Sequence, residues 1–235
     1  MKKKILAVIG LRSGSKSIKD KNIKKLDGKP LFFHILKSAK KSKLINKIII
    51  STDSNRYIKI IKKYGEEFPY KRPKKYSSDD SPEIFFIKDL LEKLKKNDNY
   101  VPDIVVRLLA TCPFQKTVDI DKSINLILKN KYDSAAVISK AKQHPEKALK
   151  ILGKKTKYLS TYFANKPLEV GSRLNRQQFK DAYFRANVLV CKREIIEKYN
   201  SLTSKRPGFV IIPYQIDIDD LEDFKFAEFK SKNLS

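Results

Sequence analysis

ILAVIGLRSGSKSIKDKN, residues 5–22, begins as an apolar run and continues into a polar, positively charged loop. An apolar run of this kind is typical of a strand buried on both faces of a sheet. Gly14 permits close approach to the loop backbone, and positive charge beside hydroxyl donors is the chemistry that binds phosphate. The residues that provide it are Arg12, Ser13, Ser15, Lys16 and Lys21. A plain surface turn in a lysine-rich chain is the alternative interpretation of this loop.

Apolar runs and polar connections alternate along the rest of the chain. Further strand-like segments lie at 47–52, 103–111, 134–139, 183–191 and 209–214. Helical apolar stripes lie at 31–41, 83–96, 117–129 (with Thr117 as a possible cap) and 221–232. Strands separated by helices predict a three-layer α/β fold with a mainly parallel sheet. Because ligands bind beyond the carboxyl ends of such strands, we expect the loops 12–22, 52–56 and 111–117 to form one crevice.

The region from about 140 to 182 is less regular than the rest. It contains Pro145, Gly153, Pro167 and Gly171 with polar runs between them. We interpret it as an insertion or protruding arm within a single domain that spans residues 1–235, not as a second independent domain.

The charge of the chain limits its possible partners. The 235 residues carry a formal net charge of +26, with 43 lysines and 9 arginines. A nucleic-acid-binding surface would gather this charge on one face and use arginine for contacts to bases, whereas these lysines are spread along the whole sequence. The two cysteines, Cys112 and Cys191, form neither a disulfide framework nor a metal-ligand pattern. With no apolar segment long enough to span a bilayer, we expect a soluble cytoplasmic protein that binds neither membrane nor specific nucleic acid.

The acidic stretch YQIDIDDLEDF, residues 214–224, predicts a cation site. Asp217 and Asp219 flank Ile218, so in an extended segment both carboxylates face the same side. Two carboxylates beside a phosphate site suit Mg²⁺, which usually combines one or two protein carboxylates with substrate phosphates. Helix capping is the alternative for one of these residues, since Asp219 or Asp220 could cap a helix that begins near Leu221.

Seven motifs together resemble one enzyme family and occur in its order. They are LRSGSKSIKDKN at 11–22, GKPL at 28–31, ISTDS at 50–54, KRPKKYSSDDS at 71–81, ATCPF at 110–114, FRAN at 184–187 and IDIDDLEDF at 216–224. The chain is similar to the cytidylyltransferases that make CMP-sugars from sialic, legionaminic and pseudaminic acids. This resemblance covers almost the whole chain. It implies a Rossmann-like nucleotide-diphospho-sugar transferase fold, CTP and a nonulosonic acid as substrates, Mg²⁺ as cofactor, and a homodimer in which residues 140–182 form the protruding dimerisation arm.

The resemblance also assigns roles to residues. It places Arg12, Ser15, Lys21 and Asn22 on the triphosphate, with Ser13 and Gly14 in the same loop. It places Arg72, Asp79 and Ser81 near the cytidine, and Asp217 and Asp219 on the metal, so that the catalytic group is Arg12, Lys21, Asp217 and Asp219. On the sugar it places Arg176, Gln177, Gln178, Phe184, Arg185 and Asn187.

The chain departs from the family pattern at two positions. Leu109 stands where sialate enzymes often have a glutamine that contacts the sugar, and Val188 stands where glycine is common. These changes leave the identity of the sugar open. Two other functions also remain as alternatives: a sugar-1-phosphate nucleotidyltransferase, which shares the fold and the metal chemistry, and a basic nucleic-acid-binding protein.

Overall fold

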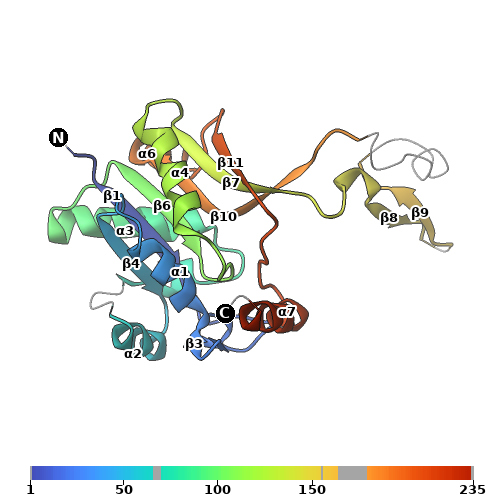
Figure 1. Ribbon diagram of the computed structural model, residues 1–235, viewed down its shortest axis with the longest axis horizontal. Coiled ribbons are helices and arrows are strands. Elements are labelled where there is room, and N and C mark those ends of the chain that lie inside the picture. Colours follow the sequence, from blue (N-terminus) through green and yellow to red (C-terminus); the bar gives the residue numbers. More distant parts are fainter. Residues whose placement is uncertain (1, 66–69, 155, 164–178, 234–235) are drawn as a thin grey trace.

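The computed structural model describes residues 2–65, 70–154, 156–163 and 179–233. Its centre is a seven-stranded sheet in the order β11-β7-β10-β6-β1-β4-β5 (Figure 1). The strands are β1 (Ile5–Gly10), β4 (Lys47–Thr52), β5 (Tyr70–Lys71), β6 (Ile104–Leu109), β7 (Ser134–Lys140), β10 (Tyr183–Lys192) and β11 (Gly208–Ile212). β1 pairs in parallel with β4 and β6, and β7 with β11, whereas β10 runs antiparallel to both β6 and β7. The predicted mainly parallel sheet is confirmed.

Helices cover both faces of this sheet, as the three-layer prediction requires. They are α1 (Leu31–Lys40), α2 (Asn55–Lys63), α3 (Glu83–Asp98), α4 (Thr117–Leu128), α6 (Arg193–Tyr199) and α7 (Leu221–Lys232). Alternate residues of β1 separate the two interfaces: Ile5, Ala7 and Ile9 pack against α1, α2 and α4, while Leu6 and Val8 pack against α3 and α6. β1 is therefore buried on both faces, which explains its continuous apolar sequence.

The helix α7 packs outside these layers. Its buried residues Phe224 and Ala227 contact a small cluster that includes Ile18, Ile216 and Ile218. This cluster fixes the acidic segment before α7 against the loop that follows β1. Two distant parts of the sequence thus meet at one end of the sheet.

The arm leaves this body after β7. Within it, β8 (Leu149–Leu152) and β9 (Tyr158–Thr161) pair as a separate two-stranded antiparallel sheet, at the far right of Figure 1. A second small ribbon, β2 (Lys25–Leu26) with β3 (Lys29–Pro30), lies beside α7.

Two predictions about local structure were wrong. Thr117 does not cap α4: it is the first helical residue, and its hydroxyl donates to the carbonyl oxygen of Ser38 at 2.8 Å. The strands predicted at 103–111 and 209–214 end earlier, at Leu109 and Ile212, because the chain leaves the sheet there to enter the loops that follow.

Candidate functional site

A cavity of about 510 Å³ opens at the carboxyl ends of β1 and β6, on the face of the sheet that α3 covers. Its wall combines the loop after β1, the segment before α3 and the end of β6. The lining residues are Gly10, Arg12, Ser15, Lys16, Ser17, Lys21, Asn22, Arg72, Tyr76, Ser78, Asp79, Ser81, Glu83, Phe86, Arg107, Leu108, Leu109, Thr111 and Asp219. The position agrees with the general location of ligands in parallel α/β sheets.

Gly10, the last residue of β1, keeps the floor of this cavity open. A Cβ atom at this position would lie 3.0 Å from Nη2 of Arg72 and 3.3 Å from Cζ of Phe86. Both contacts are closer than ordinary van der Waals packing. Glycine therefore allows the Arg72 side chain to lie directly against the end of the strand.

Arg72 places a buried positive charge in the cavity wall. The residue is 6% exposed, its Nε donates to Oγ of Ser51 at 3.0 Å, and its guanidinium carbon lies 3.7 Å from the centroid of the Phe86 ring. Burial lowers the pKa of Arg72 to about 10, so it remains a cation at neutral pH. Within the described residues it makes no ion pair with a carboxylate. A buried cation without an acidic partner has an unfavourable desolvation free energy. An electron-rich ligand in the cavity would compensate this charge.

The loop 12–22 is anchored at both ends on the segment that begins α2. At one end the backbone N–H and the hydroxyl of Ser13 donate to the two carboxylate oxygens of Asp53, at 2.9 and 2.8 Å. At the other end Asp20 accepts from Arg56 at 2.7 Å and from the Tyr57 hydroxyl at 3.1 Å. These contacts fix the loop against α2, and three of its cations, Arg12, Lys16 and Lys21, line the cavity.

The anchors change the interpretation of two predicted residues and one predicted loop. Both donors of Ser13 are used by Asp53, and neither Ser13 nor Gly14 lines the cavity. The loop 52–56 was predicted to form part of the crevice, and that prediction was wrong. Its residues lie behind the loop 12–22 and hold it in place, because their polar groups are engaged in these hydrogen bonds.

Lys21 connects the cationic loop to the acidic segment. Its ammonium group donates to the carbonyl oxygen of Ile218 at 2.7 Å and lies 3.7 Å from Oδ1 of Asp219. The Ser17 hydroxyl also donates to the carbonyl oxygen of Asp219. Asn22 braces the loop from within, through a 2.9 Å hydrogen bond from its side-chain nitrogen to the carbonyl oxygen of Arg12.

The acidic segment has the alternation that its sequence predicts. Ile216 and Ile218 are buried, while Asp217 and Asp219 are exposed. The surrounding protein raises the pKa of Asp219 by partial desolvation, and the neighbouring Asp217 carboxylate raises it further, with Lys21 opposing both. Two carboxylates on one side of an extended segment thus repel each other, and a bound cation would relieve this repulsion.

Asp220 has a different environment from the two residues before it. It is the N-cap of α7 and forms a capping box: its Oδ1 accepts from the N–H of Asp223 at 2.9 Å, and Asp223 Oδ2 accepts from the N–H of Asp220 at 3.3 Å. The geometry agrees with the prediction that Asp220 caps the helix.

Comparison with known proteins decides the family. The model of the cytidylyltransferase family matches residues 6–229. The chain belongs to the cytidylyltransferase family. A *Campylobacter coli* protein named post-translational flagellin modification protein B is 31% identical over 237 residues, which is 98% of this chain and 97% of that protein.

Two further proteins are similar to this cytidylyltransferase. The CMP-N,N'-diacetyllegionaminic acid synthase of *Legionella pneumophila* is 36% identical over 123 residues, which is 52% of this chain and 53% of that protein. The solved structure of a CMP-2-keto-3-deoxy-manno-octonic acid synthetase in complex with CTP has a TM-score of 0.72 and 13% identity, and the match covers 99% of this chain and 100% of that chain. Because the identity is only 13%, the similarity to this solved structure shows the fold alone.

The predicted CTP-binding residues divide into two groups. The first group comes from separate parts of the sequence but lines this same cavity. It consists of Arg12, Ser15, Lys21, Asn22, Arg72, Asp79 and Ser81. Asp79, in the segment before α3, forms ion pairs with Arg12 and with Lys16 of the loop 12–22, the latter at 2.5 Å. Ser13 and Gly14 form the second group and lie outside the wall.

The residues predicted to contact the sugar are not gathered in this cavity. Phe184 and Arg185 are exposed on β10, and neither they nor Asn187 nor the predicted metal ligand Asp217 lines the wall. Arg176, Gln177 and Gln178 lie outside the described residues. Asn187 is fully buried at an irregularity of β10 between Arg185 and Leu189, and its side-chain oxygen and nitrogen have no hydrogen-bond partner in the part of the chain that the structure describes.

Arg107 is a cavity residue that the sequence analysis missed. It points from β6 toward α3, where its Nε lies 3.1 Å from Oε1 of Glu83, and its Nη1 donates to the carbonyl oxygen of Asn187 at 2.8 Å. Its side chain is 11% exposed, and burial lowers its pKa. A charged residue inside the apolar run IVVRLL was a usable signal, because a buried strand accepts a charge only where a partner or a ligand compensates it.

The donor set for a metal ion consists of the two aspartates. Over the described ranges there is no group of three or more histidine, cysteine or acidic residues that could hold a metal by itself. The Cys112 thiol lies close to Asp217 and Asn187 but is buried. Asp219 lines the cavity and Asp217 does not, and these two exposed carboxylates of one segment fit Mg²⁺ with substrate oxygens completing its coordination.

Two further features of the chain are its histidines and the apolar character of its helices. His34 and His144 lie away from the cavity wall: His34 Nε2 is 2.9 Å from the carbonyl oxygen of Leu26, and His144 stacks on Phe179. None of the helices in the described ranges combines the length and the apolar character needed to cross a membrane.

Proposed function

We propose that this cytidylyltransferase transfers CMP from CTP to the anomeric hydroxyl of a nine-carbon α-keto sugar acid and releases pyrophosphate. The observation that carries the proposal is the cavity in which a cationic loop and an acidic segment meet through Lys21. Family membership supports the nucleotide, and the name of the *Legionella* relative, a CMP-N,N'-diacetyllegionaminic acid synthase, supports a sugar acid as the acceptor.

The residues of the cavity fit nucleotidyl transfer. The hydroxyl oxygen of the sugar attacks the α-phosphorus, and the bond from that phosphorus to the oxygen bridging the α- and β-phosphates breaks. Pyrophosphate leaves, and the hydroxyl proton passes to solvent. Catalysis of such a reaction is mostly positioning and electrostatic stabilisation. Arg12 and Lys21 would hold the triphosphate and neutralise the charge that grows on the leaving group. Arg72 and Ser81, which also line the cavity, would hold the cytidine.

Asp217 and Asp219 would hold Mg²⁺. When bound, this ion supplies a divalent positive charge that polarises oxygen ligands and can lower the pKa of a hydroxyl group. The repulsion between the two carboxylates and the position of Asp219 in the cavity wall support this assignment.

The proposal includes a homodimer that forms through the arm. β8 and β9 expose apolar side chains away from the central sheet, with Leu149 47%, Ile151 68%, Tyr158 60% and Leu159 51% exposed. An exposed apolar surface of this kind is typical of a protein–protein interface. Light scattering should give twice the chain mass of 27.2 kDa, and a mass equal to one chain would contradict the dimer.

Cytoplasmic localisation is also part of the proposal. Cys112 and Cys191 are both buried free thiols, which agrees with a reducing compartment.

Pyrophosphate release tests the proposed reaction. The enzyme should release pyrophosphate from CTP in the presence of free sialic, legionaminic or pseudaminic acid, and not with hexose 1-phosphates. Release only with a sugar phosphate would instead support a sugar-1-phosphate nucleotidyltransferase. The Asp217→Asn variant is the control, because it should abolish release with every acceptor if the metal assignment is correct.

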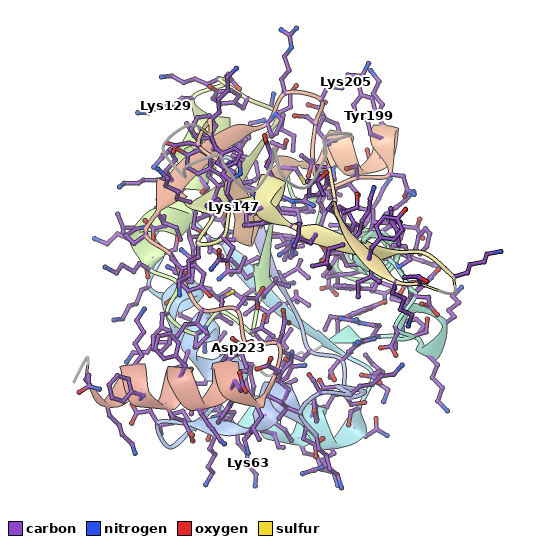
Figure 2. The ribbon with its side chains drawn as sticks, turned by 90° about the vertical axis from the view of Figure 1, so that its right-hand side faces the viewer. Lys63, Lys129, Lys147, Tyr199, Lys205 and Asp223 are labelled. Carbon is purple, nitrogen blue, oxygen red and sulfur yellow. The ribbon has the colours of Figure 1, made fainter. Side chains whose placement is uncertain are left out.

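The distribution of charge gives no support to nucleic-acid binding. In Figure 2 the labelled residues Lys63, Lys129, Lys147 and Lys205 lie at widely separated places on the molecule. We therefore expect weak association with DNA that moderate salt removes. Tight binding at physiological salt without any nucleotidyl transfer would contradict the enzyme assignment.

A further inference from the structure

The ion pairs of Asp79 have a consequence for how the triphosphate enters the site. Asp79 lies between η2 (Lys74–Tyr76) and α3, and its carboxylate contacts the guanidinium of Arg12 and the ammonium of Lys16. Hydrogen bonding to Lys16, and then to Arg12, holds the pKa of Asp79 below its usual value. Asp79 is therefore an anion that binds two cations of the loop 12–22.

The other acidic residues of the cavity wall each pair with a different cation. Glu83 pairs with Arg107, and Asp219 lies 3.7 Å from Lys21. Within the described structure, Asp79 is thus the acidic residue of the cavity wall that pairs with both Arg12 and Lys16. A triphosphate carries several negative charges and would need the same two cations. If Asp79 stayed in place, its carboxylate would lie beside the phosphate oxygens, and like charges at such distances repel.

The segment 77–81, which carries Asp79, has no backbone hydrogen bond to the cavity floor within the described structure. Its backbone hydrogen bonds in the described structure are local, from the N–H of Ser77 to the carbonyl oxygen of Lys74 at 3.0 Å and from the N–H of Ser81 to that of Ser78 at 3.3 Å. The two ion pairs of Asp79 connect this segment to the loop 12–22. Their side chains are partly exposed, at 35% for Arg12 and 36% for Asp79, so these contacts can be exchanged for others at small cost.

We propose that Asp79 is an internal competitor for the triphosphate: it occupies Arg12 and Lys16 in the ligand-free enzyme, and the phosphate groups displace it. Asp79 thereby sets the affinity of the loop for polyphosphate and favours release of the pyrophosphate product, because its carboxylate can take back the two cations. This role rests on the proposed function, in which the loop 12–22 binds the triphosphate.

Titration calorimetry with inorganic tripolyphosphate tests this role without requiring turnover. Removing two partly exposed ion pairs that compete with the ligand should raise the affinity for tripolyphosphate about three- to tenfold in Asp79→Asn. Asp80→Asn is the matched control, because this substitution removes the same charge from the neighbouring position. Asp80 is exposed and makes no hydrogen bond or ion pair with the described residues. Its affinity should stay close to that of the wild type.

Each result is decisive for the proposal. Tighter binding by Asp79→Asn alone supports it, and so does binding that only this variant shows. Unchanged or weaker binding, an equal gain in Asp80→Asn, or no binding by any of the three proteins overturns it. These results are independent of the acceptor, so an enzyme that fails to make a CMP-sugar would refute the proposed function and leave this test intact.

Hydrogen exchange on the wild type gives a second measurement that does not depend on a variant folding. Adding tripolyphosphate should speed amide exchange in residues 77–81, because Asp79 then loses its ion pairs with Arg12 and Lys16. Slower or unchanged exchange in these residues would contradict the displacement of Asp79.

Discussion

Replacing Gly10 with alanine should disturb the cavity floor and weaken CTP binding. The new Cβ would lie 3.0 Å from Nη2 of Arg72 and 3.3 Å from Cζ of Phe86, so one or both side chains must shift. Overpacking of this kind costs roughly 1–3 kcal/mol. Alanine also lowers the conformational entropy of the unfolded chain, which stabilises the folded protein by about 0.4–1 kcal/mol and offsets part of this cost. We therefore expect a net loss of about 1 kcal/mol, which lowers Tm by roughly 2–4 °C in a protein of this size.

Gly14→Ala is the matched control for this prediction. A Cβ at Gly14 has no heavy atom of the structure within 4 Å, and its backbone φ lies outside the region that only glycine adopts readily. The same chemical change should therefore leave stability unchanged or raise it by up to about 1 kcal/mol. Thermal unfolding and calorimetric titration with CTP measure both effects. If Gly10→Ala is as stable as Gly14→Ala and binds CTP like the wild type, the assignment of Gly10 and Arg72 to the cavity floor is refuted.

Three further predictions concern charged residues of the site. Arg12→Ala should weaken transition-state stabilisation by roughly 1.5–3 kcal/mol in kcat/KM while the protein stays folded, and unchanged kinetics would exclude contact with phosphate. Asp217→Asn or Asp219→Asn should nearly abolish turnover at every Mg²⁺ concentration, whereas Asp220→Asn should cost only up to about 1 kcal/mol of stability, and equal inactivity of all three would contradict the metal assignment. Arg107→Met should lower stability by about 1–3 kcal/mol in chemical unfolding, because the buried carbonyl oxygen of Asn187 loses its donor, and a neutral result would show that solvent replaces it.

The architecture could be predicted because most elements have strong, local signals. β1 is a continuous apolar run, β4 contains three consecutive isoleucines, and α1 and α3 have apolar stripes. α2 was missed, since it buries only Tyr57 and Ile61 and is otherwise rich in lysine.

The direction of β10 could not be predicted from local pattern. A strand that is antiparallel to both its neighbours has the same apolar composition as a parallel one. The chain enters β10 from the arm rather than from a helical crossover, and this long-range connection reverses its direction.

The site was predictable where chemistry is encoded by adjacent residues. The alternation of Asp217 and Asp219 around Ile218 gives two carboxylates on one side directly from the sequence. The contacts of Asp79 with Arg12 and Lys16 join residues more than sixty positions apart, and no local pattern specifies them. The same holds for Asp53, which looked like part of the crevice but anchors Ser13 from behind.

Phosphorus NMR of the reaction products tests the central claim most directly. With CTP, Mg²⁺ and a free nine-carbon α-keto sugar acid, we predict equal amounts of pyrophosphate and a product with a single phosphorus resonance, as a CMP-sugar ester requires. A product with two coupled phosphorus resonances, formed only from a sugar 1-phosphate, would show that the acceptor is phosphorylated. That result would contradict the transfer of CMP to an anomeric hydroxyl.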